Sequence, residues 1–136
     1  MPHVTIEYSA NVAARMDMAQ FVRAVHAAAL ATGVFPIGGV RTRAYATQFY
    51  EIADGHPDNA FVHVVLRIGE GRDLPTRKRA CEQMLAAVCA ALEQPFNDAP
   101  LAISLEMQEI DGQLSYRKNN LHDYVARRHA DPTAPS

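Results

Sequence analysis

The chain has 136 residues, and its 13 Lys+Arg against 15 Asp+Glu give a formal net charge of −2 at pH 7. This length fits one domain with a core of its own. The near-neutral balance excludes a protein that binds phosphate backbones, which requires a basic excess. No run approaches the roughly 20 apolar residues of a membrane helix, and the start of the chain lacks a signal-peptide pattern. We therefore expect a soluble, cytoplasmic protein that binds neither nucleic acid nor a membrane.

The first part of the chain predicts a strand, a helix and further strand structure. Residues 3–8 alternate between apolar and polar side chains, which is typical of a half-buried strand. Asp17 can cap the following helix, because Gln20 three residues later completes a capping-box pattern. That helix ends at Gly33, and its apolar stripe is Met18, Phe21, Val22, Val25 and Ala29. Residues 40–52 are rich in β-branched and aromatic side chains and predict one long or bent strand pair.

The same order of elements then repeats. Residues 60–68 predict a strand with every second side chain apolar, and Asp73 can cap the helix that follows. Pro95 is expected to end this helix, whose apolar stripe is Cys81, Met84, Leu85, Val88 and Leu92. Residues 101–110 alternate most clearly and predict the closing strand.

The two cysteines, Cys81 and Cys89, fall in that second helix. Eight residues of helix separate their Cα atoms by about 12 Å, which is too far for a disulfide. No Cys/His spacing of a metal site occurs either. We expect both cysteines to be small core residues in a reducing compartment.

These elements predict an α+β fold with a duplicated β-α-β unit, at about residues 2–52 and 60–110. Two such units form a four-stranded sheet with two helices packed on one face. A short C-terminal helix completes a single domain over residues 1–126. The polar residues 127–136 are expected to form a disordered tail.

The face of the sheet away from the helices is predicted to be mixed in character. It would carry Thr5, His63 and Arg67, but also Phe61 and Val65. Apolar side chains on an uncovered sheet face favour a homo-oligomer that covers them.

Pro2 follows the initiator methionine and directly precedes the first strand. If Met1 is removed, the Pro2 nitrogen becomes a secondary amine; if Met1 stays, that nitrogen is an amide without basicity. Burial or nearby cations would lower the pKa of such an amine from about 8. The neutral amine could then act as a general base near pH 7. Taken alone this is a weak signal, because proline follows methionine in many proteins.

Three arginines lie at glycine-rich turns in the two units. Arg41 and Arg43 follow Gly38 and Gly39, and Arg72 follows the Gly-Glu-Gly turn at residues 69–71. Glycine lets the backbone approach a ligand, and the arginine fork binds carboxylates through two hydrogen bonds. These turns together with an amine base would suit proton transfer on a small dicarboxylate. From spacing alone, solvated loop charges are an equally good interpretation.

Several segments together resemble the 5-carboxymethyl-2-hydroxymuconate isomerase family of the tautomerase superfamily, which includes 4-oxalocrotonate tautomerase and macrophage migration inhibitory factor. The resemblance covers Pro2 to about Tyr124, in order and spacing. The segments that carry it are Pro2-His3 with its strand and residues 31–43, 53–55, 60–63, 67–72 and 118–122.

The resemblance implies a duplicated β-α-β fold and a homotrimer with its sheets facing inward. It implies Pro2 as the catalytic base and assigns the family's arginines to Arg41 and Arg72. The implied reaction is a cofactor-free, metal-free isomerisation of an unsaturated dicarboxylate or tricarboxylate. The implied setting is the bacterial degradation of homoprotocatechuate, which derives from 4-hydroxyphenylacetate.

Three further residues are candidates for binding the substrate. Arg43 and Arg67 are alternatives to the two assigned arginines. His63 shares a strand face with Arg67 and could touch a ligand, although a packed or interface histidine is the more common interpretation.

Two other functions stay open at this point. One is a different tautomerase-superfamily activity on a related unsaturated acid. The other is a non-catalytic trimeric binding protein that has kept the fold. The presence of Pro2, Arg41 and Arg72 together favours the enzyme.

Overall fold

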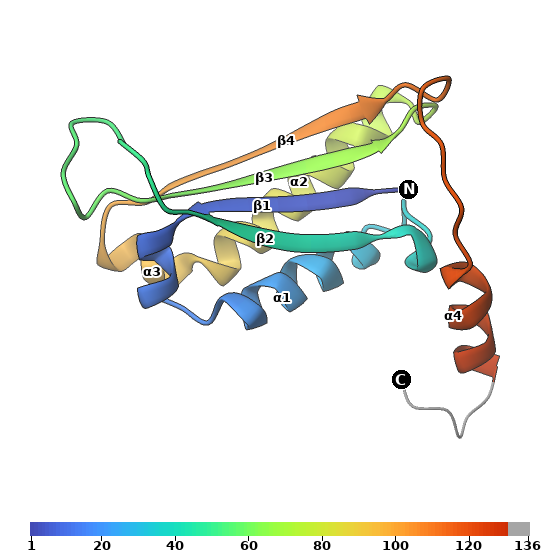
Figure 1. The fold of residues 1–136 in the computed structure, drawn as a ribbon, viewed down its shortest axis with the longest axis horizontal. Coiled ribbons are helices and arrows are strands. Elements are labelled where there is room, and N and C mark those ends of the chain that lie inside the picture. The colour runs from blue at the N-terminus through green and yellow to red at the C-terminus, as the bar shows by residue number, and fades with distance from the viewer. Residues whose placement is uncertain (131–136) are drawn as a thin grey trace.

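A computed structural model describes residues 1–130. One mixed sheet organises the molecule, with the strand order β2-β1-β3-β4 (Figure 1). The inner strands β1 and β3 run antiparallel, and each outer strand runs parallel to its inner neighbour. The strands are β1 (His3–Ser9), β2 (Arg41–Thr47), β3 (Phe61–Gly69) and β4 (Ala102–Ile110). Each pair of parallel strands with its connecting helix is one β-α-β unit, so the expected duplication is confirmed.

Two long helices, α1 (Met18–Ala31) and α2 (Leu74–Ala91), pack on one face of the sheet (Figure 1). Aspartates cap both helices, as expected: the Asp17 carboxylate accepts the Gln20 N–H at 3.1 Å, and Asp73 accepts the Thr76 N–H at 2.8 Å. Alternation in the strands places the core side chains between these layers. The largest buried side chains there are Phe21, Ile6, Leu66, Ile68, Met84 and Leu92.

The expected strand pair at residues 40–52 is wrong beyond Thr47. Strand β2 ends there, and residues 48–60 form a loop that extends past one end of the sheet (Figure 1). Local geometry accounts for this, because Ala53 and Gly55 adopt φ of 54° and 82°, which a strand does not accommodate. The Asn59 side chain also donates to the Ile52 carbonyl at 2.9 Å and fixes the turn.

Helix α2 packs on the core with a slightly different face from the one that its sequence predicts. Ala80, Met84 and Val88 are buried on α2, whereas Leu85 is 40% exposed. Small Ala80 continues the i, i+4 row of the core, so the stripe turns away from Leu85. Cys89 is also exposed rather than part of the core.

Pro95 does not end that helix, contrary to expectation. Helix α2 stops at Ala91, and a new helix, α3 (Glu93–Asp98), begins after Leu92. Pro95 lies in the first turn of α3, where its missing N–H costs no helical hydrogen bond.

Short elements complete the chain. Two 3₁₀ helices, η1 (Ala10–Ala14) and η2 (Ile37–Gly39), follow β1 and precede β2. Helix α4 (Leu121–Ala130) is longer than expected, so residues 127–130, assigned to a disordered tail, are helical. The rest of that tail, residues 131–136, lies outside the described residues. Helix α4 lies beyond the end of the sheet at which the chain begins (Figure 1).

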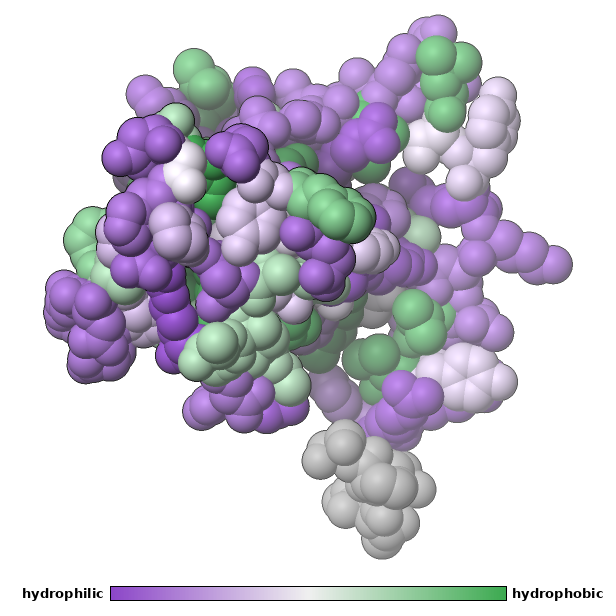
Figure 2. Space-filling model, turned by 60° about the vertical axis from the view of Figure 1, so that its left-hand side comes forward, coloured by the Kyte–Doolittle hydropathy of each residue, from purple (hydrophilic) through white to green (hydrophobic). Residues whose placement is uncertain are grey.

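The other face of the sheet has no helix over it (Figure 1). Phe61, His63 and Val65 of β3 are half-buried on this open face, and Arg67 is exposed. Turned to bring the loop end forward, the surface shows apolar and polar residues interspersed (Figure 2). Within residues 1–130, no helix is both long and apolar enough to cross a bilayer.

Candidate functional site

A pocket of about 300 Å³ lies at the end of the sheet where the chain begins. Its walls come from both units and from the C-terminal segment. The residues that matter chemically are Met1, Pro2, Glu70, Arg72, Arg117 and His122.

The fold places Pro2 in this pocket through the parallel pairing of β1 with β2. Pro2 is buried, and its carbonyl accepts the backbone N–H of Arg41 at 3.1 Å. Gly39 permits the close approach, because a Cβ added there would lie 3.3 Å from Cδ of Pro2. The chain's start is therefore held against the glycine turn that precedes β2.

Arg41 and Arg72 are fixed by backbone carbonyls rather than by carboxylates. Arg41 Nη1 donates to the Gly39 carbonyl at 3.1 Å and lies 3.3 Å from the sulfur of Met1. Arg72 donates to the carbonyls of Gly69 and Val34, at 3.2 and 3.4 Å. Because neutral carbonyls hold these guanidinium groups in place, the hydrogen bonds leave their positive charge available to an anion.

Phe35 gives Arg72 further support. The guanidinium carbon of Arg72 lies 5.3 Å from the centre of the Phe35 ring, a cation–π distance. Glu70, the acidic residue in the pocket wall, accepts the backbone N–H of Gly112 at 3.0 Å.

The C-terminal segment closes one side of the pocket, and reasoning from the sequence missed its role. Arg117 and His122 line the pocket, and Asn119 donates to the Gly38 carbonyl at 3.4 Å. A Cβ added to Gly38 would lie only 2.6 Å from Nδ1 of His122, so glycine is required for this contact. The signal available in the sequence was the 118–122 segment, which carries the resemblance but had no chemistry assigned.

Two titratable groups near the pocket have lowered pKa values. Burial, then the charges of Arg117, Arg72 and Arg41, lower the pKa of the chain's α-amino group below its ordinary value. Burial is also the largest cause that lowers the pKa of the His3 imidazole, and neighbouring arginine charges add to it. A neutral amine is thus favoured at the chain's start.

The structure brings some of the candidate residues together and leaves others apart. Pro2 and Arg72 line the pocket, and the Arg41 guanidinium lies beside Met1 at its edge. Arg43 and Arg67 lie outside the pocket on the open sheet face, where Arg43 Nη1 contacts His3 Nδ1 at 2.9 Å.

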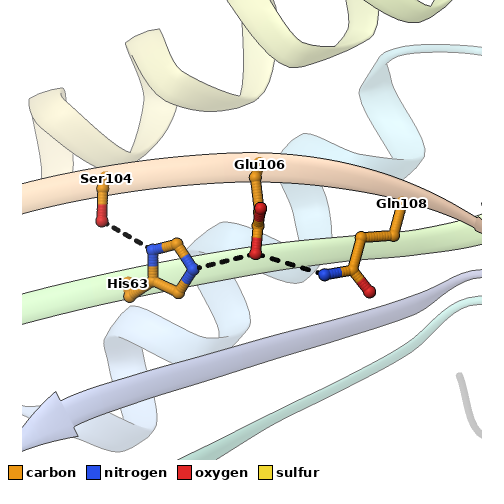
Figure 3. A network of polar contacts seen from close by, with 4 residues as sticks. All are labelled: His63, Ser104, Glu106 and Gln108. Atoms are coloured by element: carbon orange, nitrogen blue, oxygen red, sulfur yellow. Dashed lines mark hydrogen bonds and ion pairs between the residues drawn. The ribbon is translucent and has the colours of Figure 1, made fainter.

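His63 also lies outside the pocket, in a polar cluster on the open face (Figure 3). Its Nδ1 lies 2.6 Å from the Ser104 hydroxyl, and its Nε2 lies 3.3 Å from the Glu106 carboxylate. Gln108 donates to the same carboxylate at 3.3 Å. This cluster joins β3 to β4.

A larger hollow of about 750 Å³ lies in the loop that follows β2, but its lining includes no arginine. Within the described part of the chain, no group of three or more His, Cys, Asp or Glu is arranged to hold a metal ion. The pocket at the chain's start is therefore the candidate active site, because a buried terminus and several cations converge there.

Comparisons with known proteins identify the family of this chain. A family model described as 5-carboxymethyl-2-hydroxymuconate isomerase matches residues 2–125. A 5-carboxymethyl-2-hydroxymuconate Delta-isomerase from Escherichia coli is 34% identical over 122 residues, covering 90% of this chain and 97% of that protein.

Solved structures give the same result. A crystal structure of a 5-carboxymethyl-2-hydroxymuconate delta-isomerase matches with a TM-score of 0.86 at 29% identity, covering 92% of this chain and 93% of that one. A 5-carboxymethyl-2-hydroxymuconate isomerase from Deinococcus radiodurans R1 matches with a TM-score of 0.84 at 32% identity, covering 91% and 93%. A fused 4-OT described as an asymmetric trimer shares the fold alone, with a TM-score of 0.61 at 12% identity over 92% and 99% of the two chains.

Proposed function

Because the chain belongs to the 5-carboxymethyl-2-hydroxymuconate isomerase family, we propose that it moves a double bond in 5-carboxymethyl-2-hydroxymuconate by proton transfer, without a cofactor. The setting would be the degradation of homoprotocatechuate. A cytoplasmic location suits the two free thiols, Cys81 and Cys89.

The observation that carries this proposal is the position of the chain's start, in a pocket among three arginines. Removal of Met1 moves the free amine to Pro2, which is buried where Met1 is only half-buried. The causes that lower the pKa of the present amino group, burial and the charges of Arg117, Arg72 and Arg41, then act on the Pro2 amine. A lowered pKa raises the fraction of this amine that is neutral and able to accept a proton near pH 7.

The substrate loses one proton and regains one, so the reaction is an isomerisation. The neutral Pro2 amine takes the proton from the 2-hydroxyl group, and the O–H electron pair spreads over the diene as a dienolate. The resulting ammonium returns a proton to a carbon of the dienolate, so that a C–H bond forms and C2 becomes a carbonyl carbon. No electrons are gained or lost overall, which is consistent with chemistry that needs no redox cofactor.

The arginines would bind the substrate and stabilise the dienolate. Arg72 and Arg41 are held by carbonyls, so their remaining N–H groups can bind carboxylates through charge-assisted hydrogen bonds. Positive charge fixed beside the developing oxyanion lowers the barrier, since it acts more strongly on the dienolate than on the neutral hydroxyl group.

We further propose that the protein is a homotrimer whose copies cover the open sheet faces. Phe61 and Val65 lie half-buried on that face without a helix over them. The fused 4-OT that shares this fold is described as a trimer. Sedimentation equilibrium tests this directly, since a trimer has three times the 14.9 kDa of one chain; a monomer at micromolar concentration would contradict it.

Pro2→Ala tests the proposed base. The substitution leaves a primary α-amine but removes the ring that holds the amine in the pocket, and kcat/KM for 5-carboxymethyl-2-hydroxymuconate should fall about 100-fold, within the range for a misplaced catalytic group. Pro75→Ala in the first turn of α2 is the matched control and should leave kcat/KM unchanged. Full activity of Pro2→Ala would refute the role of Pro2.

The pH profile gives a second test of the same group. Only the neutral amine accepts a proton, so kcat/KM should be constant above the lowered pKa of the amine and fall as the pH drops through that pKa. A profile that begins to fall only below pH 5 would indicate a carboxylate base instead.

A further inference from the structure

The segment that follows β4 belongs to neither β-α-β unit, yet it forms one wall of the pocket. It is fixed on both sides of Arg117. Before Arg117, the Gly112 N–H donates to Glu70 at 3.0 Å, and after it, Asn119 donates to the Gly38 carbonyl at 3.4 Å. The backbone that carries Arg117 is therefore anchored to both glycine-rich turns of the site.

Arg117 differs from the other two arginines of the site in what its side chain contacts. Backbone carbonyls hold Arg41 and Arg72. Arg117 is exposed at the pocket and takes part in neither of the ion pairs found within residues 1–130. Among the charged groups near the chain's amino terminus, Arg117 contributes most to the lowered pKa of the α-amino group. Its guanidinium is thus a cation at the pocket that neither ion pair within residues 1–130 neutralises.

The charge of the proposed substrate matches the number of arginines. Muconate carries two carboxylates, and the 5-carboxymethyl group adds a third. The β-α-β units supply Arg72 in the pocket wall and Arg41 at the pocket's edge, and the acidic Glu70 already accepts the Gly112 N–H. One carboxylate is therefore left without a cationic partner from the two units.

We propose that Arg117 binds the carboxymethyl carboxylate and that the C-terminal segment selects tricarboxylate over dicarboxylate substrates. This inference rests on the proposed isomerase function for the identity of the substrate. An arginine fork suits a terminal carboxylate, because two parallel N–H···O bonds fix both its oxygens. Since Arg117 is exposed, we expect a modest preference of about 10- to 30-fold from this contact.

The first experiment compares turnover of two substrates by Arg117→Ala. They are 5-carboxymethyl-2-hydroxymuconate and 2-hydroxymuconate, which lacks the carboxymethyl group that carries the third carboxylate. Each kcat/KM is measured on the flat part of the variant's own pH profile, so that a changed amine pKa does not enter. The ratio of the two kcat/KM values should fall about 10- to 30-fold relative to wild type. Lys118→Ala removes a neighbouring charge that does not line the pocket and should keep the wild-type ratio. An unchanged ratio in Arg117→Ala overturns the proposal.

The second experiment separates this inference from the isomerase function. Calorimetry measures the binding of two saturated compounds that cannot react, 2-carboxymethylhexanedioate and hexanedioate. Wild type should prefer the tricarboxylate, and Arg117→Ala should lose that preference. If wild type turns over neither muconate but shows this Arg117-dependent preference, the proposed function fails and the binding inference stands. If Arg117→Ala keeps the preference, the inference is wrong whatever the turnover shows.

Discussion

Because Gly38 contacts His122, a single added methyl group, in Gly38→Ala, should release the C-terminal segment from the pocket wall. A Cβ on Gly38 would lie 2.6 Å from Nδ1 and 2.9 Å from Cα of His122. Carbon atoms pack at about 3.5 Å or more, so Gly38→Ala requires the backbone of α4 to move away by about 0.6 Å (3.5 less 2.9 Å). A side-chain rotation cannot relieve this clash, because the second contact is to the backbone.

The free-energy cost of that clash is large relative to the few contacts that hold α4 in place. Inserting a methyl group into a closed contact typically costs about 1 to 3 kcal/mol. Helix α4 has no fully buried residue, and the bond from Asn119 to Gly38 is long at 3.4 Å. A cost of about 2 kcal/mol lowers the docking equilibrium about 30-fold. The core lies elsewhere, so the free energy of global unfolding should barely change.

Hydrogen exchange of the α4 amides is the appropriate assay. A helix of 10 residues is marginal in water once it is undocked, so these amides should exchange about 30-fold faster in Gly38→Ala. Gly69→Ala is the matched control, because a Cβ there meets nothing within 4 Å. If the α4 amides of Gly38→Ala exchange at wild-type rates, the segment is not held by this contact and the reasoning fails.

Met84→Ala should lower the free energy of unfolding by about 2 to 5 kcal/mol, because Met84 is buried. Leu85→Ala, at a side chain that is 40% exposed, should lower it by well under about 1 kcal/mol. Equal urea midpoints for the two variants would mean that α2 packs on the face its sequence predicts. Val65→Glu should dissociate the oligomer in sedimentation runs by placing a charge on the open sheet face, while Ala86→Glu on the exposed side of α2 should not; a Val65→Glu protein that keeps the wild-type mass would contradict the trimer arrangement. Hydrogen bonds hold the pKa of Asp73 below its ordinary value, so its stabilising contribution is present above the unfolded pKa near ~4 and is lost as the pH falls through the lower folded value. Asp73→Asn should therefore flatten the fall of the urea midpoint below pH 5, and an unchanged slope would show that this cap does not control it.

The strands and helix caps could be predicted because local chemistry determines them. Alternation in residues 3–8, 60–68 and 101–110 reports directly on which side chains face the core. Asp17 and Asp73 cap their helices through residues only three positions away. The end of β2 could not be predicted in this way, because β-branched and aromatic residues continue past the point at which the turn geometry breaks the strand.

The candidate site was predictable only in part, and the strand register shows why. Pro2, Arg41 and Arg72 lie at the ends of elements that the two units bring to one end of the sheet. Arg43 and His63 lie further along their strands, on the open face and away from that end. Both residues are close in the sequence to the segments that form the pocket, but their positions along the strands keep them out of the pocket.

Arg117 could not be assigned from sequence because its position depends on tertiary contacts. It lies in an irregular segment without periodicity, and the partners that anchor this segment are Gly38 and Glu70, which are distant in the chain. Neither contact leaves a local pattern that would predict a pocket wall. The paired glycines at residues 38–39 predicted the approach of a ligand to the backbone, whereas His122 and Pro2 are the groups that lie against them.

The central claim is that a free Pro2 amine performs the proton transfer. The most direct measurement is the intact mass of the purified protein together with kcat/KM of the same sample for 5-carboxymethyl-2-hydroxymuconate. We expect active protein to lack Met1, and protein that retains Met1 to be inactive, because its Pro2 nitrogen is an amide. Full activity in a sample whose mass includes Met1 would contradict the account.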